Sequence, residues 1–124
     1  MPVLRKPATP THQLGTTCFT SLATPLSGST ETAVWEVTIE PNTPATPHML
    51  TRGEVFVVLS GKATVVIGGV TDCAKVGDAI VVPANTRFEL SNVGEERLQL
   101  VCCMPVGGQA GLDDGSTFTP PWAE

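Results

Sequence analysis

Hydrophobic and polar residues alternate with a period of two along much of the chain. The clearest segment is residues 35–40, where Trp35, Val37 and Ile39 are separated by polar side chains. Such alternation places successive side chains on opposite faces of a strand, so this segment is predicted to bury one face. No window of useful length has the 3.6-residue periodicity of an amphipathic helix. The pattern therefore predicts an all-β protein.

Turn residues divide this pattern into about seven or eight short strands. The three prolines of residues 41–48 predict a loop. Ser60–Gly61 and Gly68–Gly69 predict two β-hairpins in tandem, and Pro83 interrupts a strand because proline cannot donate to the ladder. Short antiparallel strands without intervening helices are typical of a sandwich or barrel, of which a jelly roll is the natural candidate.

One domain is predicted over residues 1–124, with a barrel core at residues 24–104. The flanking segments, residues 1–16 and 105–124, are rich in Gly, Pro, Thr and Asp and are interpreted as an N-terminal arm and a C-terminal tail. Trp122 stands in the polar tail. Because a free indole beside two prolines would expose a large apolar surface, we expect it to dock on the barrel.

Composition narrows the function classes. Hydrophobic residues make up 41% and charged residues 15% of the chain, which argues against disorder and leaves few charges to solvate its surface. Burial of one face in a homodimer is therefore expected.

A net charge of −5 provides no basic stripe for nucleic acid. No apolar run suits a membrane span or a signal peptide, so a cytoplasmic location is expected, where the four cysteines would stay thiols.

His48 and Glu54 are the chemically distinctive pair. Each stands where a loop meets a predicted strand, a position from which a side chain can face a cavity. Imidazole and carboxylate together suit a divalent metal (Zn, Fe, Mn, Ni or Cu) or an acid and base pair. The alternative is a hydrogen-bonded pair that only orders the strand ends.

Two segments resemble the conserved motifs of the cupin family. In residues 47–63, PHMLTRGEVFVVLSGKA, the first-motif spacing is met by His48, Glu54 and Gly61, but Leu50 replaces the second histidine. In residues 77–92, GDAIVVPANTRFELSN, the second motif is met by Gly77, Pro83 and Asn92, with Asn85 at the usual glycine and Phe88 at the third metal histidine. The resemblance covers about residues 33–104 and implies a cupin-type antiparallel jelly-roll β-barrel, a double-stranded β-helix.

The departures from the motifs weaken the metal site that the resemblance implies. Leu50 and Phe88 put apolar surface where two imidazoles would bind an ion, so no tightly bound cofactor is expected. Alternation along residues 98–104 places Cys102 on the inward face. It is a candidate third ligand beside His48 and Glu54, although a buried free cysteine is more often an inert small hydrophobe.

The same reasoning predicts a small-molecule pocket at the barrel mouth. His48 and Glu54 would be its polar groups, Arg52 and Arg87 could bring positive charge to its rim, and its walls would be apolar: Trp35, Leu50, Phe56, Phe88, Leu90 and Met104. The alternative is a barrel in which these side chains fill the interior.

Three functional hypotheses remain open from the sequence. In the first, a small cupin binds a small, largely apolar or carboxylate-bearing molecule. His48 would anchor this molecule by a hydrogen bond, with Glu54 orienting the imidazole. If the protein is an enzyme, His48 would be the acid or base in metal-free isomerisation or lyase chemistry. In the second, a metal-dependent dioxygenase or isomerase uses His48, Glu54 and Cys102. In the third, the chain is a non-catalytic structural or regulatory dimer. The resemblance further suggests that residues 18–23 add to a partner's sheet.

Overall fold

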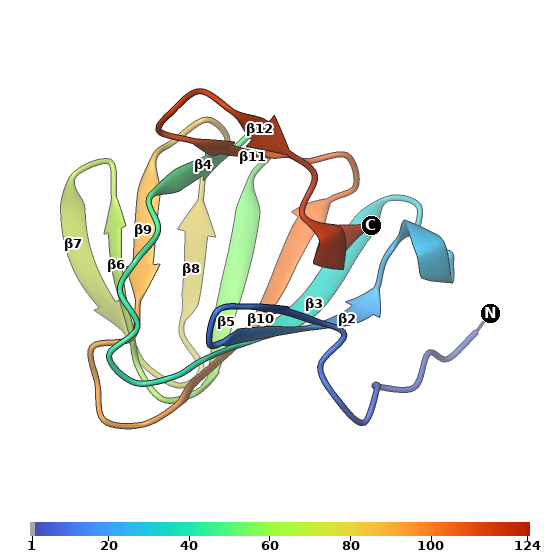
Figure 1. Cartoon of the computed structure of the whole chain (residues 1–124), viewed down its shortest axis with the longest axis horizontal. Coiled ribbons are helices and arrows are strands. Elements are labelled where there is room, and N and C mark those ends of the chain that lie inside the picture. The colour runs from blue at the N-terminus through green and yellow to red at the C-terminus, as the bar shows by residue number, and fades with distance from the viewer. Residues whose placement is uncertain (1) are drawn as a thin grey trace.

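The chain folds into two antiparallel sheets that face each other across one interior (Figure 1). The computed structural model describes residues 2–124. The first six-stranded sheet has the order β1 (His12–Leu14), β2 (Thr17–Ala23), β3 (Thr32–Ile39), β10 (Leu98–Pro105), β5 (Glu54–Ser60) and β8 (Ala79–Val82). The second has the order β12 (Thr117–Phe118), β11 (Ala110–Leu112), β4 (His48–Leu50), β9 (Phe88–Ser91), β6 (Ala63–Ile67) and β7 (Val70–Ala74).

This architecture is the predicted all-β, double-stranded β-helix. Along β3 and β10 every second side chain is buried and points into the interior, as the sequence pattern predicts. Two single-turn 3-10 helices complete the secondary structure of residues 2–124: η1 (Pro25–Ser27) and η2 (Pro121–Ala123). Neither approaches the length or apolarity that a membrane-crossing helix requires, and the described residues contain no other helix.

The turn at Ser60–Gly61 is not a hairpin, and this prediction is wrong. β5 pairs with β10 and β8, whereas β6 pairs with β7 and β9, so the chain crosses from one sheet to the other between Ser60 and Ala63. Gly61 has φ +82°, and a Cβ there would lie 2.5 Å from the carbonyl oxygen of Arg97. Glycine is therefore required at the crossing by backbone conformation and by space. The second predicted hairpin, at Gly68–Gly69, is confirmed by the pairing of β6 with β7.

Both segments interpreted as arms contribute strands. β1 pairs with β2, and β11 extends the second sheet beside β4 with Leu112 opposite His48. Trp122 docks as expected: its ring stacks on Phe19 with centroids 3.6 Å apart and an interplanar angle of 5°. The strand structure therefore extends beyond the predicted core of residues 24–104 on both sides.

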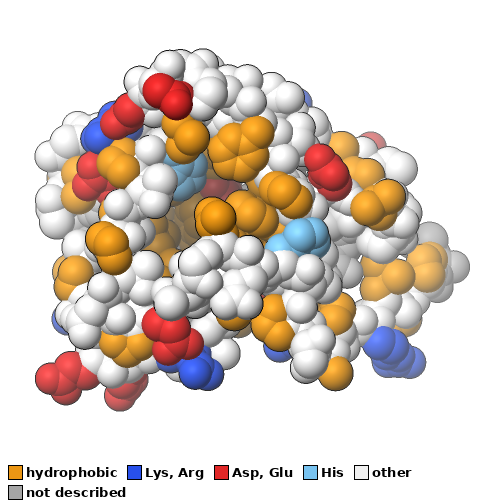
Figure 2. All heavy atoms as spheres, viewed as in Figure 1, with side chains coloured by type: hydrophobic (Ala, Val, Ile, Leu, Met, Phe, Trp, Pro, Cys, Tyr) orange, Lys and Arg blue, Asp and Glu red, His pale blue; other side chains and the backbone are white. Residues whose placement is uncertain are grey.

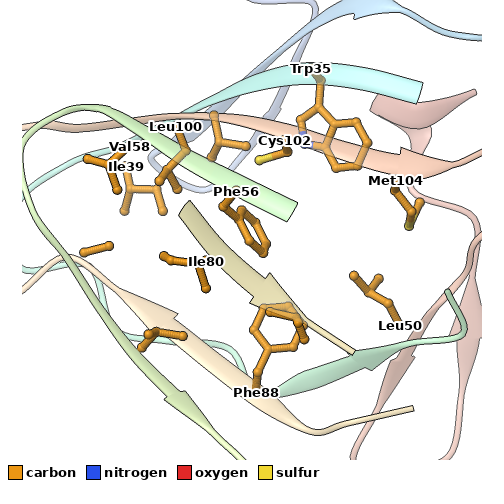
Figure 3. Close-up of a cluster of buried hydrophobic side chains, with 14 of the residues drawn as sticks. Trp35, Ile39, Leu50, Phe56, Val58, Ile80, Phe88, Leu100, Cys102 and Met104 are labelled. Atoms are coloured by element: carbon orange, nitrogen blue, oxygen red, sulfur yellow. The ribbon is translucent and has the colours of Figure 1, made fainter. Parts of the chain in front are cut away.

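The interior is a single apolar cluster built from both sheets. Figure 3 shows Phe56 from β5 and Phe88 from β9 pointing toward each other across it. Their ring centroids lie 5.9 Å apart at 60°, an edge-to-face arrangement that aromatic pairs favour. These rings, together with Leu50 and Met104, place aromatic and aliphatic surface close to His48 and Glu54.

Candidate functional site

A cavity of about 510 Å³ lies between the two sheets. Its walls come from β3, β4, β5, β9 and β10, from the turn between β1 and β2, and from the C-terminal segment. Figure 2 shows a hollow in one face of the molecule, bordered largely by hydrophobic side chains with a histidine at its edge. Ligand pockets commonly measure about 300–1,000 Å³, so this volume suits a small organic molecule.

The structure brings together most of the residues that the sequence singles out, but not Cys102, Arg52 or Arg87. Eight of them line the cavity: Trp35, His48, Leu50, Glu54, Phe56, Phe88, Leu90 and Met104. Cys102 does not line it and is fully buried within the sheet packing. Burial above all, and then the neighbouring Glu54 and Cys103, raise the pKa of the Cys102 thiol well above its ordinary value. Cys102 is thus a neutral packing residue at physiological pH.

His48 is oriented by the backbone of its own loop. Its Nδ1–H donates to the carbonyl oxygen of Thr46 at 2.8 Å, and its ring packs on Phe88 with centroids 4.4 Å apart. Because a carbonyl only accepts, the neutral imidazole carries its proton on Nδ1 and leaves Nε2 as an acceptor. The prediction that Glu54 orients the imidazole is wrong, since Thr46 performs that task.

Glu54 is buried without a hydrogen-bond partner among residues 2–124. It begins β5 opposite Val82, and only 4% of the residue is exposed. Desolvation by burial raises the pKa of its carboxyl group from 4.5 to about 8, with no contribution from a hydrogen bond or ion pair. No polar side-chain atom of the described residues is both fully enclosed and unpaired, so the carboxyl oxygens retain contact with the cavity. At neutral pH Glu54 therefore presents an uncharged carboxyl group to that space.

The cavity contains no permanent positive charge. Its lining includes no lysine and no arginine, so His48 and Glu54 are its only ionisable side chains. Arg87, a candidate for the rim, is engaged elsewhere: it forms two hydrogen bonds of 3.1 Å to Asp113 and a 3.2 Å contact with Glu89. Arg52 is exposed and does not line the cavity.

The donor set does not fit a metal ion held by three protein ligands. Among residues 2–124, no three or more His, Cys, Asp or Glu side chains cluster closely enough to hold one. Leu50 and Phe88 face the cavity from the positions where the motifs would have histidines, and the Phe88 ring packs directly on His48. The proposed set of His48, Glu54 and Cys102 is therefore not assembled, since Cys102 is fully buried and does not line the cavity.

Sequence reasoning missed one side of the cavity. The C-terminal segment contributes Ala110, Leu112, Phe118, Pro120 and Trp122, and the β1–β2 turn contributes residues 14–17. These segments lack the strand alternation that identified the other walls. The available signal was the pair of aromatic residues, Phe118 and Trp122, in an otherwise polar tail.

Comparison with known proteins identifies the family. The model of the cupin domain family matches residues 35–104, more than half of the chain, and the protein belongs to this family. A search of curated protein sequences finds no match.

Solved structures of the same fold have diverse functions. The polyketide cyclase RemF from Streptomyces resistomycificus has a TM-score of 0.68 at 19% identity, over 82% of this chain and 73% of its own. An uncharacterised double-stranded β-helix protein from Klebsiella pneumoniae has 0.66 at 18%, over 80% and 87%. Salicylate 1,2-dioxygenase from Pseudoaminobacter salicylatoxidans has 0.66 at 20%, over 77% of this chain but 26% of its own. At these identities the similarity establishes the fold alone.

Proposed function

We propose that this cupin binds a small, largely apolar molecule in the cavity between its sheets. The observation that carries the proposal is a cavity of about 510 Å³ with predominantly apolar walls and two ionisable side chains, His48 and Glu54. The volume argues against an interior filled by its own side chains. Apolar walls with a few polar groups are the usual construction of a ligand site, and burial of apolar ligand surface drives binding.

The electrostatics of the cavity favour some ligands over others. A phosphate group would lose its hydration without meeting a lysine or arginine, so phosphorylated ligands are disfavoured. Trp35, Phe56 and Phe88 offer aromatic faces and edges to a planar molecule.

The two tryptophans provide a direct test. Trp35 and Trp122 both line the cavity, and the chain contains no other tryptophan and no tyrosine. N-phenylnaphthylamine, a neutral probe that absorbs tryptophan emission, should therefore show saturable energy transfer with one probe per chain. Val37→Phe places a ring in the cavity and should abolish this signal, whereas the same change at exposed Val93 should preserve it. Equal binding by both variants would place the probe elsewhere and refute the proposal.

Proton transfer on the bound molecule is the second candidate function. His48 Nε2 is an acceptor and the Glu54 carboxyl is a donor, and both line the same cavity. The imidazole would take a proton from the carbon beside a ligand carbonyl while Glu54 protonates the carbonyl oxygen, which forms an enol, an imidazolium and a carboxylate. Return of a proton to a different carbon would give a metal-free isomerisation.

Deuterium exchange tests this chemistry without knowledge of the natural substrate. Acetylnaphthalene carries exchangeable protons beside its carbonyl, and in heavy water the protein should accelerate their loss, as followed by NMR. His48→Gln should remove the acceleration while binding of the compound persists. Exchange at the same rate with and without wild-type protein would leave binding as the function and eliminate catalysis of this type.

The homodimer is also a proposal, supported by the outer face of the first sheet. A row of aligned apolar residues crosses four strands there: Val34, Cys103, Val55 and Val81. Val81 is 64% exposed on β8, which ends the sheet, so a second copy could cover this row and extend the edge. Sedimentation should give a mass of about twice 13.0 kDa for the wild type and a lower mass for Val81→Lys. Val70→Lys, at another exposed valine, is the control and should keep the wild-type mass. A wild-type mass near 13.0 kDa would refute the dimer.

A further inference from the structure

Glu54 is buried in a way that the fold itself does not explain. A buried polar group ordinarily has a hydrogen-bond partner, and one left unpaired costs about 1–3 kcal/mol. Glu54 forms no hydrogen bond within residues 2–124 and lies in the cavity wall with 4% of the residue exposed. The missing partner is therefore expected to come from the molecule that occupies the cavity.

We infer that Glu54, as a neutral carboxyl group, donates a hydrogen bond to an uncharged oxygen of the ligand, so that the cavity selects neutral carbonyl compounds. The inference rests on the proposed function and specifies its ligand class. Planar aromatic ketones, aldehydes and quinones combine such an acceptor with apolar surface. The role differs from the sequence hypothesis, in which His48 anchors the ligand and Glu54 merely positions the imidazole.

The elements packed around Glu54 supply no charge that would ionise it. Cys102 from β10 is a neutral thiol. Val82 on β8, the register partner of Glu54, is aliphatic. On the cavity side the other ionisable group is His48, whose Nδ1–H is already engaged by Thr46. Burial alone raises the pKa of Glu54 to about 8. The carboxyl group therefore keeps its proton at neutral pH and acts as a donor.

The same surroundings disfavour a ligand carboxylate. Moving an anion into this space removes its hydration, and no lysine or arginine lines the cavity to compensate. A hydrocarbon of equal size would fill the space but leave the Glu54 hydroxyl unpaired. A neutral carbonyl avoids both costs, because it carries no net charge and accepts the hydrogen bond.

Three isosteric compounds separate these cases: acetylnaphthalene, isopropenylnaphthalene and naphthoic acid, all substituted at the same carbon. Binding is measured through quenching of Trp35 and Trp122 and by displacement of N-phenylnaphthylamine. At about pH 6.5 the wild type should bind the ketone about tenfold more tightly than the hydrocarbon, the gain typical of one hydrogen bond. It should bind the naphthoate anion more weakly than either.

Two substitutions assign the preference to Glu54. Glu54→Leu removes the donor, so it should bind ketone and hydrocarbon with equal affinity. Glu54→Gln keeps an N–H donor in a similar shape and should retain the preference for the ketone. Circular dichroism of both variants establishes that they are folded before affinities are compared.

The pH dependence tests the wild type without any substitution. Between about pH 6.5 and pH 9.5 the carboxyl group loses its proton, so the ketone preference of the wild type should disappear. Glu54→Gln does not titrate and should keep its preference over this range. Loss of the preference in both proteins would assign the change to another group and overturn the inference.

The outcomes distinguish the inference from the function on which it rests. Equal affinity of the wild type for ketone and hydrocarbon, with both bound in the cavity, would overturn the role of Glu54 and leave small-molecule binding intact. A ketone preference that survives in Glu54→Leu would do the same. Failure of all three compounds and of N-phenylnaphthylamine to bind would overturn both.

Discussion

Two buried polar side chains near opposite ends of β10 have very different surroundings. Asn92, 1% exposed, donates to the carbonyl oxygens of Ile39 and Glu96 at 3.0 and 2.8 Å and accepts from the Gly94 N–H at 3.1 Å. It lies beside the end of β10 at which Leu98 pairs with Ile39. Glu54 begins β5, which reaches the other end near Cys103, and is almost as buried but has no partner in residues 2–124.

The difference between Asn92 and Glu54 separates a residue that stabilises the barrel from a residue that is available for function. Asn92 satisfies backbone groups that the loops around it leave open, so its contribution is structural. Glu54 satisfies nothing in the described chain and faces a cavity. Its burial lowers stability, and we attribute its presence to the proposed ligand.

The largest expected effect comes from removing the satisfied group. Asn92→Ala leaves the carbonyls of Ile39 and Glu96 and the N–H of Gly94 without their partner and should lower the free energy of unfolding by about 4 kcal/mol. Glu54→Leu is the matched control and should be neutral or stabilising at neutral pH, since it removes an unpaired polar group. Urea unfolding monitored by tryptophan fluorescence measures both, and a greater loss in Glu54→Leu would reverse the comparison.

Leucine truncations compare the filled interior with the cavity wall. Leu98 is fully buried away from the cavity, so Leu98→Ala should cost about 3 kcal/mol in unfolding free energy. Leu50 borders the cavity and already lacks packing on one side, so Leu50→Ala should cost about half as much. Denaturant midpoints give the two values. Equal costs would show that the space beside Leu50 is packed.

The stability of the wild type should fall as pH rises through the neutral range. The pKa of the Glu54 carboxyl group rises from its ordinary value of 4.5 to about 8 in the folded protein, so between these values the folded state holds one proton more than the unfolded state. Its contribution is complete below about pH 4.5 and is lost as pH approaches 8. From about pH 5.5 to pH 7.5 the wild type should lose about 2 kcal/mol more than Glu54→Gln does. Parallel pH profiles for the two proteins would place the folded pKa near its ordinary value.

The smallest effect on stability is expected at the aromatic stack that closes the cavity. Trp122→Ala removes the stack on Phe19 but leaves the 2.7 Å hydrogen bond from Ser21 Oγ to the backbone carbonyl of residue 122. It should cost about 1 kcal/mol and accelerate release of N-phenylnaphthylamine, because part of the wall is gone. Stopped-flow measurement, with Trp35 as donor, checks the rate. Phe118→Ala, on the same wall but without the stack, should release the probe more slowly than Trp122→Ala.

Local patterns in the chain predicted eight of the residues that line the cavity. Alternation along β3 and β10 put Trp35 and Met104 on inward faces, and the pattern of loops and strands placed His48 and Glu54 at loop–strand junctions. These features depend on the direction of a side chain within one strand, which a few neighbouring residues decide.

Features that depend on contacts between distant segments were not predictable in the same way. The Ser60–Gly61 turn resembles a hairpin turn, yet the strands it joins find their partners elsewhere, β5 with β10 and β8, and β6 with β7 and β9. The tail lacks alternation, yet β11 pairs with β4. In both cases strand pairing is decided by segments far away in the sequence, and no local residue pattern records it.

The amino-acid sequence by itself determined the fold family, the inward faces of the principal strands and the two polar groups among apolar neighbours. Only the tertiary structure decided that the interior keeps a cavity, that the C-terminal segment walls it, that Thr46 rather than Glu54 orients His48, and that Glu54 is left without a partner. Side-chain direction follows from neighbouring residues, whereas an unfilled volume and an unpaired carboxyl group result from how all the elements pack against one another.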